Sequence, residues 1–70
     1  MTARELLRII QARGAKLGVS VWEGSRHTAA SVGTCRTAIP RHPGEDIKPG
    51  TLRAIERQLE PCLGKGWLRK

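Results

Sequence analysis

The spacing of the apolar residues changes twice along this chain, from a helical repeat to alternation and back, and this pattern constrains the fold more than any other feature. Residues 16–39 carry the alternating pattern in short stretches broken by turn residues, and helical spacing precedes and follows them. A sheet with one apolar face and two helices with one apolar stripe each bury those surfaces against one another. The sequence therefore predicts two helices packed on one face of a small antiparallel sheet.

The first helix is expected to begin after Thr2. Thr2 and Glu5 form a capping-box pattern, in which each side chain accepts a hydrogen bond from the other residue's backbone N–H. The apolar stripe of this helix consists of Leu6, Leu7, Ile9 and Ile10. Gly14 is expected to end the helix in the left-handed conformation, which glycine adopts without steric cost.

Three strands are expected next, as an antiparallel meander. The first strand covers residues 16–22, and its buried face is predicted to carry Leu17, Val19 and Val21. Turns at residues 23–25 and 33–34 separate it from strands at residues 27–32 and 35–39. Pro40 ends the third strand, because proline cannot donate a hydrogen bond to a strand ladder.

The second helix is expected to begin at Pro49, since the first helical position needs no backbone N–H. Its buried stripe is predicted to consist of Leu52, Ile55 and Leu59. Glu45 and Asp46 precede the helix and are expected to stabilise its N-terminus, and Pro61 is its expected end. The residues after Pro61 form either a short packed turn or a frayed tail.

These elements define a two-layer α+β fold of the double-stranded-RNA-binding type, in the order helix, three-stranded antiparallel sheet, helix. The predicted domain covers residues 1–60, and residues 61–70 form a short C-terminal extension. Because the chain has no Phe and no Tyr, its core must be mostly aliphatic. Such a fold settles no function by itself.

The charge of the chain indicates the kind of partner. Thirteen Lys and Arg residues against six Asp and Glu residues give a formal net charge of +7. This balance favours a polyanion or an acidic protein as partner, and a basic protein without special affinity is the alternative. No apolar signal and no run of about 18 apolar residues is present, so we expect a cytoplasmic chain that does not enter the membrane.

Cys35 and Cys62 have no C-x-x-C spacing and no neighbouring histidine in sequence. Together with the expected cytoplasmic location, this predicts two free thiols, with a disulfide as the less favoured alternative. No carboxylate cluster suggests a hard-metal site, and we expect neither a metal nor another cofactor.

His27 and His42 are the two side chains that can both accept and donate a proton near neutral pH. Cleavage of RNA needs little more, because the substrate's own 2′-hydroxyl is the nucleophile and the adjacent phosphate is the electrophile. His27 is therefore the candidate catalytic residue, with an ordinary exposed strand histidine as the alternative. His42 is a candidate for binding RNA or for a second proton-transfer group, although a histidine in such a turn more often bonds backbone.

The groups expected to bind RNA surround these two histidines in the sequence. Arg26 and Arg41 are expected to hold phosphates, and Gly24 and Ser25 let backbone N–H groups and a hydroxyl approach a phosphate closely. Lys48 is expected to add a further cationic contact. Arginine at position 26 can hold a phosphate but cannot act as a base at neutral pH.

Two segments resemble the HicA toxins of HicAB toxin–antitoxin systems: Gly24-Ser25-Arg26-His27, and the run from Pro40 to Ile55. Residues 2–7 and Gly14 fit the same pattern less specifically, and the similarity covers residues 2 to about 59. The resemblance implies a metal-independent mRNA endoribonuclease, held inactive by a HicB-type antitoxin that covers the active surface, and it allows a higher-order toxin–antitoxin complex. It also implies that His27 is the functional histidine.

The chain departs from the family pattern in two places. Arg26 stands where a first histidine is more frequent, and the strand after His27 is poor in bulky and aromatic residues, so any base stacking must come from elsewhere. A non-catalytic RNA-binding module of the same fold is the alternative function. A DNA-binding regulator is a third possibility and is less favoured, because no helix-turn-helix pair is found.

Overall fold

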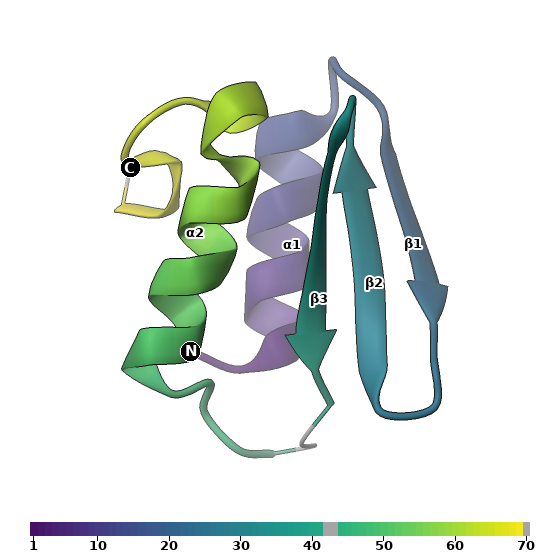
Figure 1. The fold of residues 1–70 in the computed structure, drawn as a ribbon, viewed down its shortest axis with the longest axis vertical. Helices are drawn as coiled ribbons and strands as arrows, with labels where there is room; N and C mark the ends of the chain where they lie inside the picture. The colour runs from purple at the N-terminus through teal and green to yellow at the C-terminus, as the bar shows by residue number, and fades with distance from the viewer. Residues whose placement is uncertain (42–43, 70) are drawn as a thin grey trace.

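The computed structural model describes residues 1–41 and 44–69 and shows a two-layer α+β fold (Figure 1). The elements in chain order are α1 (Ala3–Gly14), β1 (Val19–Glu23), β2 (His27–Val32), β3 (Cys35–Pro40), α2 (Pro49–Leu63) and the 3₁₀ turn η1 (Trp67–Arg69). The predicted order of helix, three-stranded antiparallel sheet and helix, in a double-stranded-RNA-binding arrangement, is confirmed. No helix among the described residues is long and apolar enough to cross a membrane.

The capping box at the start of α1 is present. The Glu5 N–H donates to the Thr2 hydroxyl at 3.2 Å, and the Thr2 N–H donates to the Glu5 carboxylate at 3.0 Å. The hydrogen bond from the Thr2 backbone, with a second from its hydroxyl, lowers the pKa of Glu5. These bonds satisfy two of the N–H groups that a helix start leaves without partners.

Gly14 ends α1, but not in the left-handed conformation expected from the sequence. Its φ is not among the positive values, and Ala15, the residue that follows the helix, is right-handed. Gly14 is instead buried, and a Cβ at this position would lie 2.8 Å from side-chain carbons of both Val19 and Val32. The glycine is therefore required for the close approach of α1 to the sheet, and the chain turns at Gly18, whose φ is +87°.

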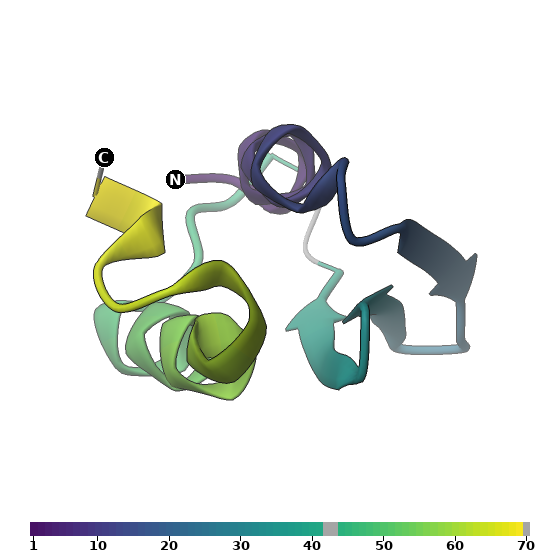
Figure 2. The same cartoon turned by 90° about the horizontal axis from the view of Figure 1, so that it is seen from above.

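The strands form one antiparallel sheet in the order β1-β2-β3, with both helices on the same side and α2 beside β3 (Figure 2). Residues that pair across strands share a face. The helix-covered face carries Thr28, Ala30 and Val32 from β2 and their β3 partners Ile39, Thr37 and Cys35. The opposite face, which we call the open face, carries Ser20, Trp22, His27, Ala29, Ser31, Arg36, Ala38 and Pro40. Among the described residues, no helix lies on this open face.

The prediction that β1 has a buried side is wrong. Leu17 lies before the strand and is 51% exposed, Val21 is 38% exposed, and only Val19 is half-buried. β1 is an edge strand, and the helices cover the sheet mainly over β2 and β3, which supply its fully buried residues. The alternation therefore marks a strand correctly but does not show how far the helices extend over it.

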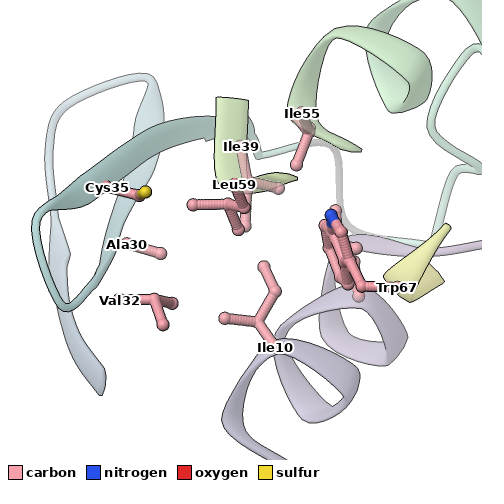
Figure 3. Packing of buried hydrophobic residues seen from close by; sticks show 9 residues of the cluster. Ile10, Ala30, Val32, Cys35, Ile39, Ile55, Leu59 and Trp67 are labelled. Carbon is pink, nitrogen blue, oxygen red and sulfur yellow. The ribbon is translucent and has the colours of Figure 1, made fainter. Parts of the chain in front are cut away.

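The core lies between the helices and the covered face of the sheet (Figure 3). Its buried members are Leu6, Ile10, Ala30, Val32, Cys35, Ile39, Ile55, Leu59 and Trp67. Trp67 is 2% exposed, and its indole N–H donates to the Glu56 carbonyl at 2.9 Å. Of the two alternatives for the C-terminal residues, the packed turn is therefore the one observed.

Two predictions for α2 are wrong. The helix continues through Pro61 to Leu63, because the packing of the residues beyond Pro61 outweighs the loss of one backbone hydrogen bond. Pro49 opens the helix as predicted, but its N-cap is Lys48, without a side-chain bond. Asp46 instead lies 3.2 Å from the amino group of Met1, in a contact that joins the loop before α2 to the start of the chain.

The expectation of free thiols is also wrong, because Cys35 and Cys62 form a disulfide. Cys35 is the first residue of β3, and Cys62 lies in the last turn of α2. They are 27 residues apart in sequence, but α2 packs beside β3 and brings their Cα atoms to 6.2 Å, within the usual range for a disulfide. The spacing of the two cysteines in the sequence does not predict this pair, because the pairing depends on how β3 and α2 pack.

Candidate functional site

His27 is the first residue of β2 and lies on the open face, opposite Pro40 of β3. Its side chain is exposed, and within residues 1–41 and 44–69 no hydrogen bond joins the imidazole to another group. Its backbone, in contrast, is held firmly, since its carbonyl accepts a hydrogen bond from the Gly24 N–H at 2.8 Å. A fixed backbone with an exposed imidazole is suited to proton transfer with a bound ligand.

The hairpin of residues 24–26 sets the position of His27. A Cβ at Gly24 would lie 3.1 Å from the His27 carbonyl oxygen, closer than such contacts normally are. Glycine thus allows the two backbones to approach and close the hairpin. The Gly24 N–H is bonded to the His27 carbonyl and is not available to a ligand, whereas the side chains of Ser25 and Arg26 are exposed.

Arg41 connects the end of β3 to this hairpin. One terminal nitrogen of its guanidinium donates to the carbonyls of Gly24 at 2.6 Å and Ser25 at 2.9 Å, and the other donates to the Glu23 carboxylate at 3.0 Å. Its backbone N–H donates to the Arg26 carbonyl at 3.3 Å. The Glu23 carboxylate in turn accepts a hydrogen bond from the Thr28 hydroxyl at 2.8 Å. Arg41, expected to bind phosphate, therefore also holds the hairpin that carries His27.

A basic cleft lies beside this hairpin, between α1 and the end of the sheet. Arg4, Arg8 and Arg41 line it, and its other lining residues are Thr2, Ala3, Leu7, Gln11, Thr28 and Gly44. Arg4 and Arg8 are four residues apart and so lie on one face of α1. The fold brings these two arginines into one cleft with Arg41 and Thr28.

The two other residues predicted to bind RNA are Lys48 and His42. Lys48 is exposed at the N-cap of α2, and no recorded contact among the described residues joins it to the hairpin. His42 lies outside the described residues. Within the described ranges, no group of three or more His, Cys, Asp or Glu residues is arranged to hold a metal ion.

Trp22 and Arg36 are two residues of the open face that the sequence did not single out. The Arg36 guanidinium carbon lies 5.4 Å from the centroid of the Trp22 ring. Trp22 alternates in the sequence with the residues expected to be buried, Leu17, Val19 and Val21, and it is 43% exposed. Nothing in the sequence could pair it with Arg36, because that pairing depends on the register of three strands.

Comparison with known proteins identifies the family. The family model described as "HicA toxin of bacterial toxin-antitoxin" matches residues 3–60. No significant match was found among the curated proteins or among the solved structures. The matched span includes α1, all three strands, the hairpin of His27 and most of α2. The chain belongs to the HicA family and is the toxin of a toxin–antitoxin system.

Proposed function

We propose that this toxin is a metal-independent mRNA endoribonuclease whose catalytic residue is His27. The observation that carries the proposal is the position of this side chain: it is exposed on the open face, its backbone is fixed by the Gly24 hairpin, and no described residue bonds the imidazole. Membership of the HicA family and the net charge of +7 support the same function. An mRNA substrate also makes the cytoplasm the expected place of action.

The proposed reaction is an attack of the RNA 2′-oxygen on the adjacent phosphorus. His27 accepts the 2′-hydroxyl proton as the new P–O bond forms. The bond from phosphorus to the 5′-oxygen breaks, and this oxygen takes a proton from the imidazolium or from water. The products are a 2′,3′-cyclic phosphate and a free 5′-hydroxyl.

Exposed arginines supply the positive charge that the reaction and the RNA backbone need. Arg26 is exposed in the hairpin directly before His27, so its guanidinium is available to a phosphate. Arg4 and Arg8 line a cleft together with Arg41 and extend the basic surface for the RNA backbone. Lys48 and His42 remain predicted contacts.

We further propose that a HicB-type antitoxin neutralises the toxin by covering the surface around His27. A toxin of such a system requires a partner that blocks its activity, and the most direct block is to cover the exposed imidazole. The net charge of +7 fits an acidic surface on this partner.

Substitution of the histidine tests the proposal. His27→Ala should lower the rate of RNA cleavage by about 10²- to 10⁴-fold, the usual contribution of a general acid or base. Cleavage is measured on a labelled single-stranded RNA with purified toxin, and the ends are identified as cyclic phosphate and hydroxyl. The rate should not change when EDTA is added.

A matched control comes from Ser20→Ala, because Ser20 is exposed on the same face but lies at the far end of β1 from the hairpin. This variant should cleave like the wild type. Both variants should keep the circular dichroism spectrum and bind the antitoxin. Unchanged cleavage by His27→Ala would exclude this histidine as the catalytic residue, and binding of RNA without any cleavage by the wild type would favour the non-catalytic module.

A further inference from the structure

Trp22 is a large aromatic side chain that the fold does not use for its core. It is 43% exposed on the open face, whereas Trp67, the other tryptophan of the chain, is 2% exposed and hydrogen-bonded in the core. Tryptophan is usually well buried in folded proteins, because its ring contributes much apolar area. An exposed indole beside a candidate active site therefore points to a ligand.

The side chains that lie between Trp22 and Arg36 on the open face are small. Trp22 lies on β1 and Arg36 on β3, so their contact at 5.4 Å spans the central strand β2. The strand residues between them on the open face are Ala29, directly opposite Trp22, and Ser31, directly opposite Arg36. Because these side chains are small, the indole and the guanidinium can meet above β2.

Trp22 is also close to His27. Trp22 pairs with Ala29, and His27 lies two residues before Ala29 on the same face of β2. Such diagonal neighbours on adjacent antiparallel strands are about 7–8 Å apart. One nucleotide chain can therefore contact both side chains.

The chemistry of this face favours a nucleic acid. Its described residues include Arg36 and His27 but no carboxylate, and the acidic residue of β1, Glu23, belongs to the other face, where it binds Arg41 and Thr28. Trp22 is the one large apolar side chain among them, whereas a protein interface generally has a larger apolar centre. A single aromatic ring with a cation beside it matches one base and one phosphate.

We propose that Trp22 and Arg36 form a nucleotide-binding subsite, in which an unpaired RNA base next to the cleaved phosphate stacks on the Trp22 ring. This inference rests on the proposed function and adds the way in which the substrate is held. Arginine stacks on aromatic rings and also binds phosphate through its planar fork. At an exposed site the contact of the Arg36 guanidinium with the Trp22 ring is weak. Arg36 can therefore turn to the RNA backbone when a base stacks on the ring.

The subsite selects single-stranded RNA. A base can stack on a protein ring only when it is free of its neighbours in a helix, and an A-form duplex presents its backbone and 2′-hydroxyls instead. The aromatic residue that is lacking in the strand after His27 is thus supplied by the neighbouring strand.

Fluorescence of the tryptophans provides a test that does not depend on cleavage. The probe is a short single-stranded oligonucleotide with 2′-O-methyl groups, which has no nucleophile and so stays intact with wild-type toxin. We expect this probe to quench Trp22 and not the buried Trp67. Quenching should persist in Trp67→Phe and disappear in Trp22→Leu, and the same oligonucleotide in a duplex should quench little.

Affinity measurements separate stacking from charge. Trp22→Leu should weaken binding of the single strand by about 5- to 150-fold, the range found when one stacking contact is removed, and Trp22→Phe should restore most of it. Arg36→Gln should reduce the slope of log affinity against log salt by about 0.7, as expected for one phosphate contact on a single strand, whereas Trp22→Leu should leave it unchanged. Arg57→Gln on α2 is the matched control for loss of one exposed positive charge.

These results distinguish this inference from the proposed function. If Trp22→Leu binds the single strand as tightly as the wild type, or if it weakens only antitoxin binding, the subsite does not exist. Equal quenching by duplex and single strand would also overturn it. If the binding results hold but His27→Ala still cleaves, the subsite stands and the catalytic assignment fails.

Discussion

Arg41 holds the hairpin that carries the candidate catalytic residue His27. Two terminal nitrogens of its guanidinium reach three oxygens of the hairpin, from Glu23, Gly24 and Ser25, at 2.6–3.0 Å. Because these terminal nitrogens are engaged, we expect Arg41 to act on the proposed reaction through the backbone that it holds. Since the Gly24 N–H bonds the His27 carbonyl, a shift of the hairpin is transmitted directly to the imidazole.

Replacement of Arg41 by Lys tests this positioning role. Lysine keeps the positive charge but has a single ammonium group in place of the planar fork, so it cannot bond the three oxygens in the same geometry. We expect Arg41→Lys to lower the cleavage rate by about tenfold to 10²-fold, because a displacement of about 1 Å at a catalytic group can cost that much. Affinity for the 2′-O-methyl oligonucleotide should change little.

The same substitution on α2, Arg57→Lys, is the control and should leave cleavage unchanged. A direct phosphate contact by Arg41 would give a different pattern: Arg41→Lys would keep most of the activity, while Arg41→Gln would weaken RNA binding and lower its salt dependence. That result would contradict a positioning role.

At the scale of helices and strands, the sequence predicted what depends on local spacing. The capping box, the stripe of Ile55 and Leu59 and the strand from His27 to Val32 are all observed. The exposure of β1 and the role of Gly14 were missed, because both depend on where α1 lies against the sheet. The periodic spacing of apolar residues shows which face of a helix or strand is apolar, but not how much of that face a neighbouring element covers.

In the candidate site, too, the sequence predicted the local features and missed those that depend on packing. The family motif identified His27 and its hairpin, and the structure places them on an exposed face. The contact between Trp22 and Arg36 could not be predicted, since it requires the register of both strand pairs. The binding of Arg41 to the hairpin carbonyls was equally hidden, because it joins residues 16 and 17 positions apart.

The disulfide joins β3 and α2, which also meet through side-chain packing and through the hydrogen bond from the Thr37 hydroxyl to the Gln58 side chain at 2.6 Å. Cys35 and Cys62 connect the start of β3 to the last turn of α2 and close a loop of 27 residues. In the chain-entropy view, such a loop destabilises the unfolded state by about 3–4 kcal/mol. We therefore expect a reductant to lower the free energy of unfolding by about that amount, seen as a large decrease in the melting temperature.

The control for this experiment is the double variant Cys35→Ala, Cys62→Ala. It should melt near the temperature of the reduced wild type and should not respond to the reductant. A wild type that melts at the same temperature with and without reductant would show that the bond contributes nothing to stability.

At the scale of the whole molecule, the core extends beyond the segment that matches the family. The match ends at residue 60, but α2 continues to Leu63, and η1 inserts Trp67 between the helices (Figure 3). A chain of 70 residues buries only about 60% of the surface that it exposes when unfolded. With so small a core, one large side chain from the C-terminal segment is a substantial part of it.

Deletion of residues 61–70 tests this dependence. A domain of this length has a total stability of about 4–10 kcal/mol, and removal of a buried tryptophan alone costs about 3–5 kcal/mol. The deletion also removes the disulfide and the hydrogen bond from Trp67 to the Glu56 carbonyl. The loss is therefore comparable to the whole stability, and we expect the shortened chain to show no cooperative thermal transition by circular dichroism. The control is Trp67→Phe, which keeps most of the apolar volume and should still melt cooperatively, at a lower temperature than the wild type. A shortened chain that melts like the reduced full-length protein would show that residues 1–60 fold without this segment.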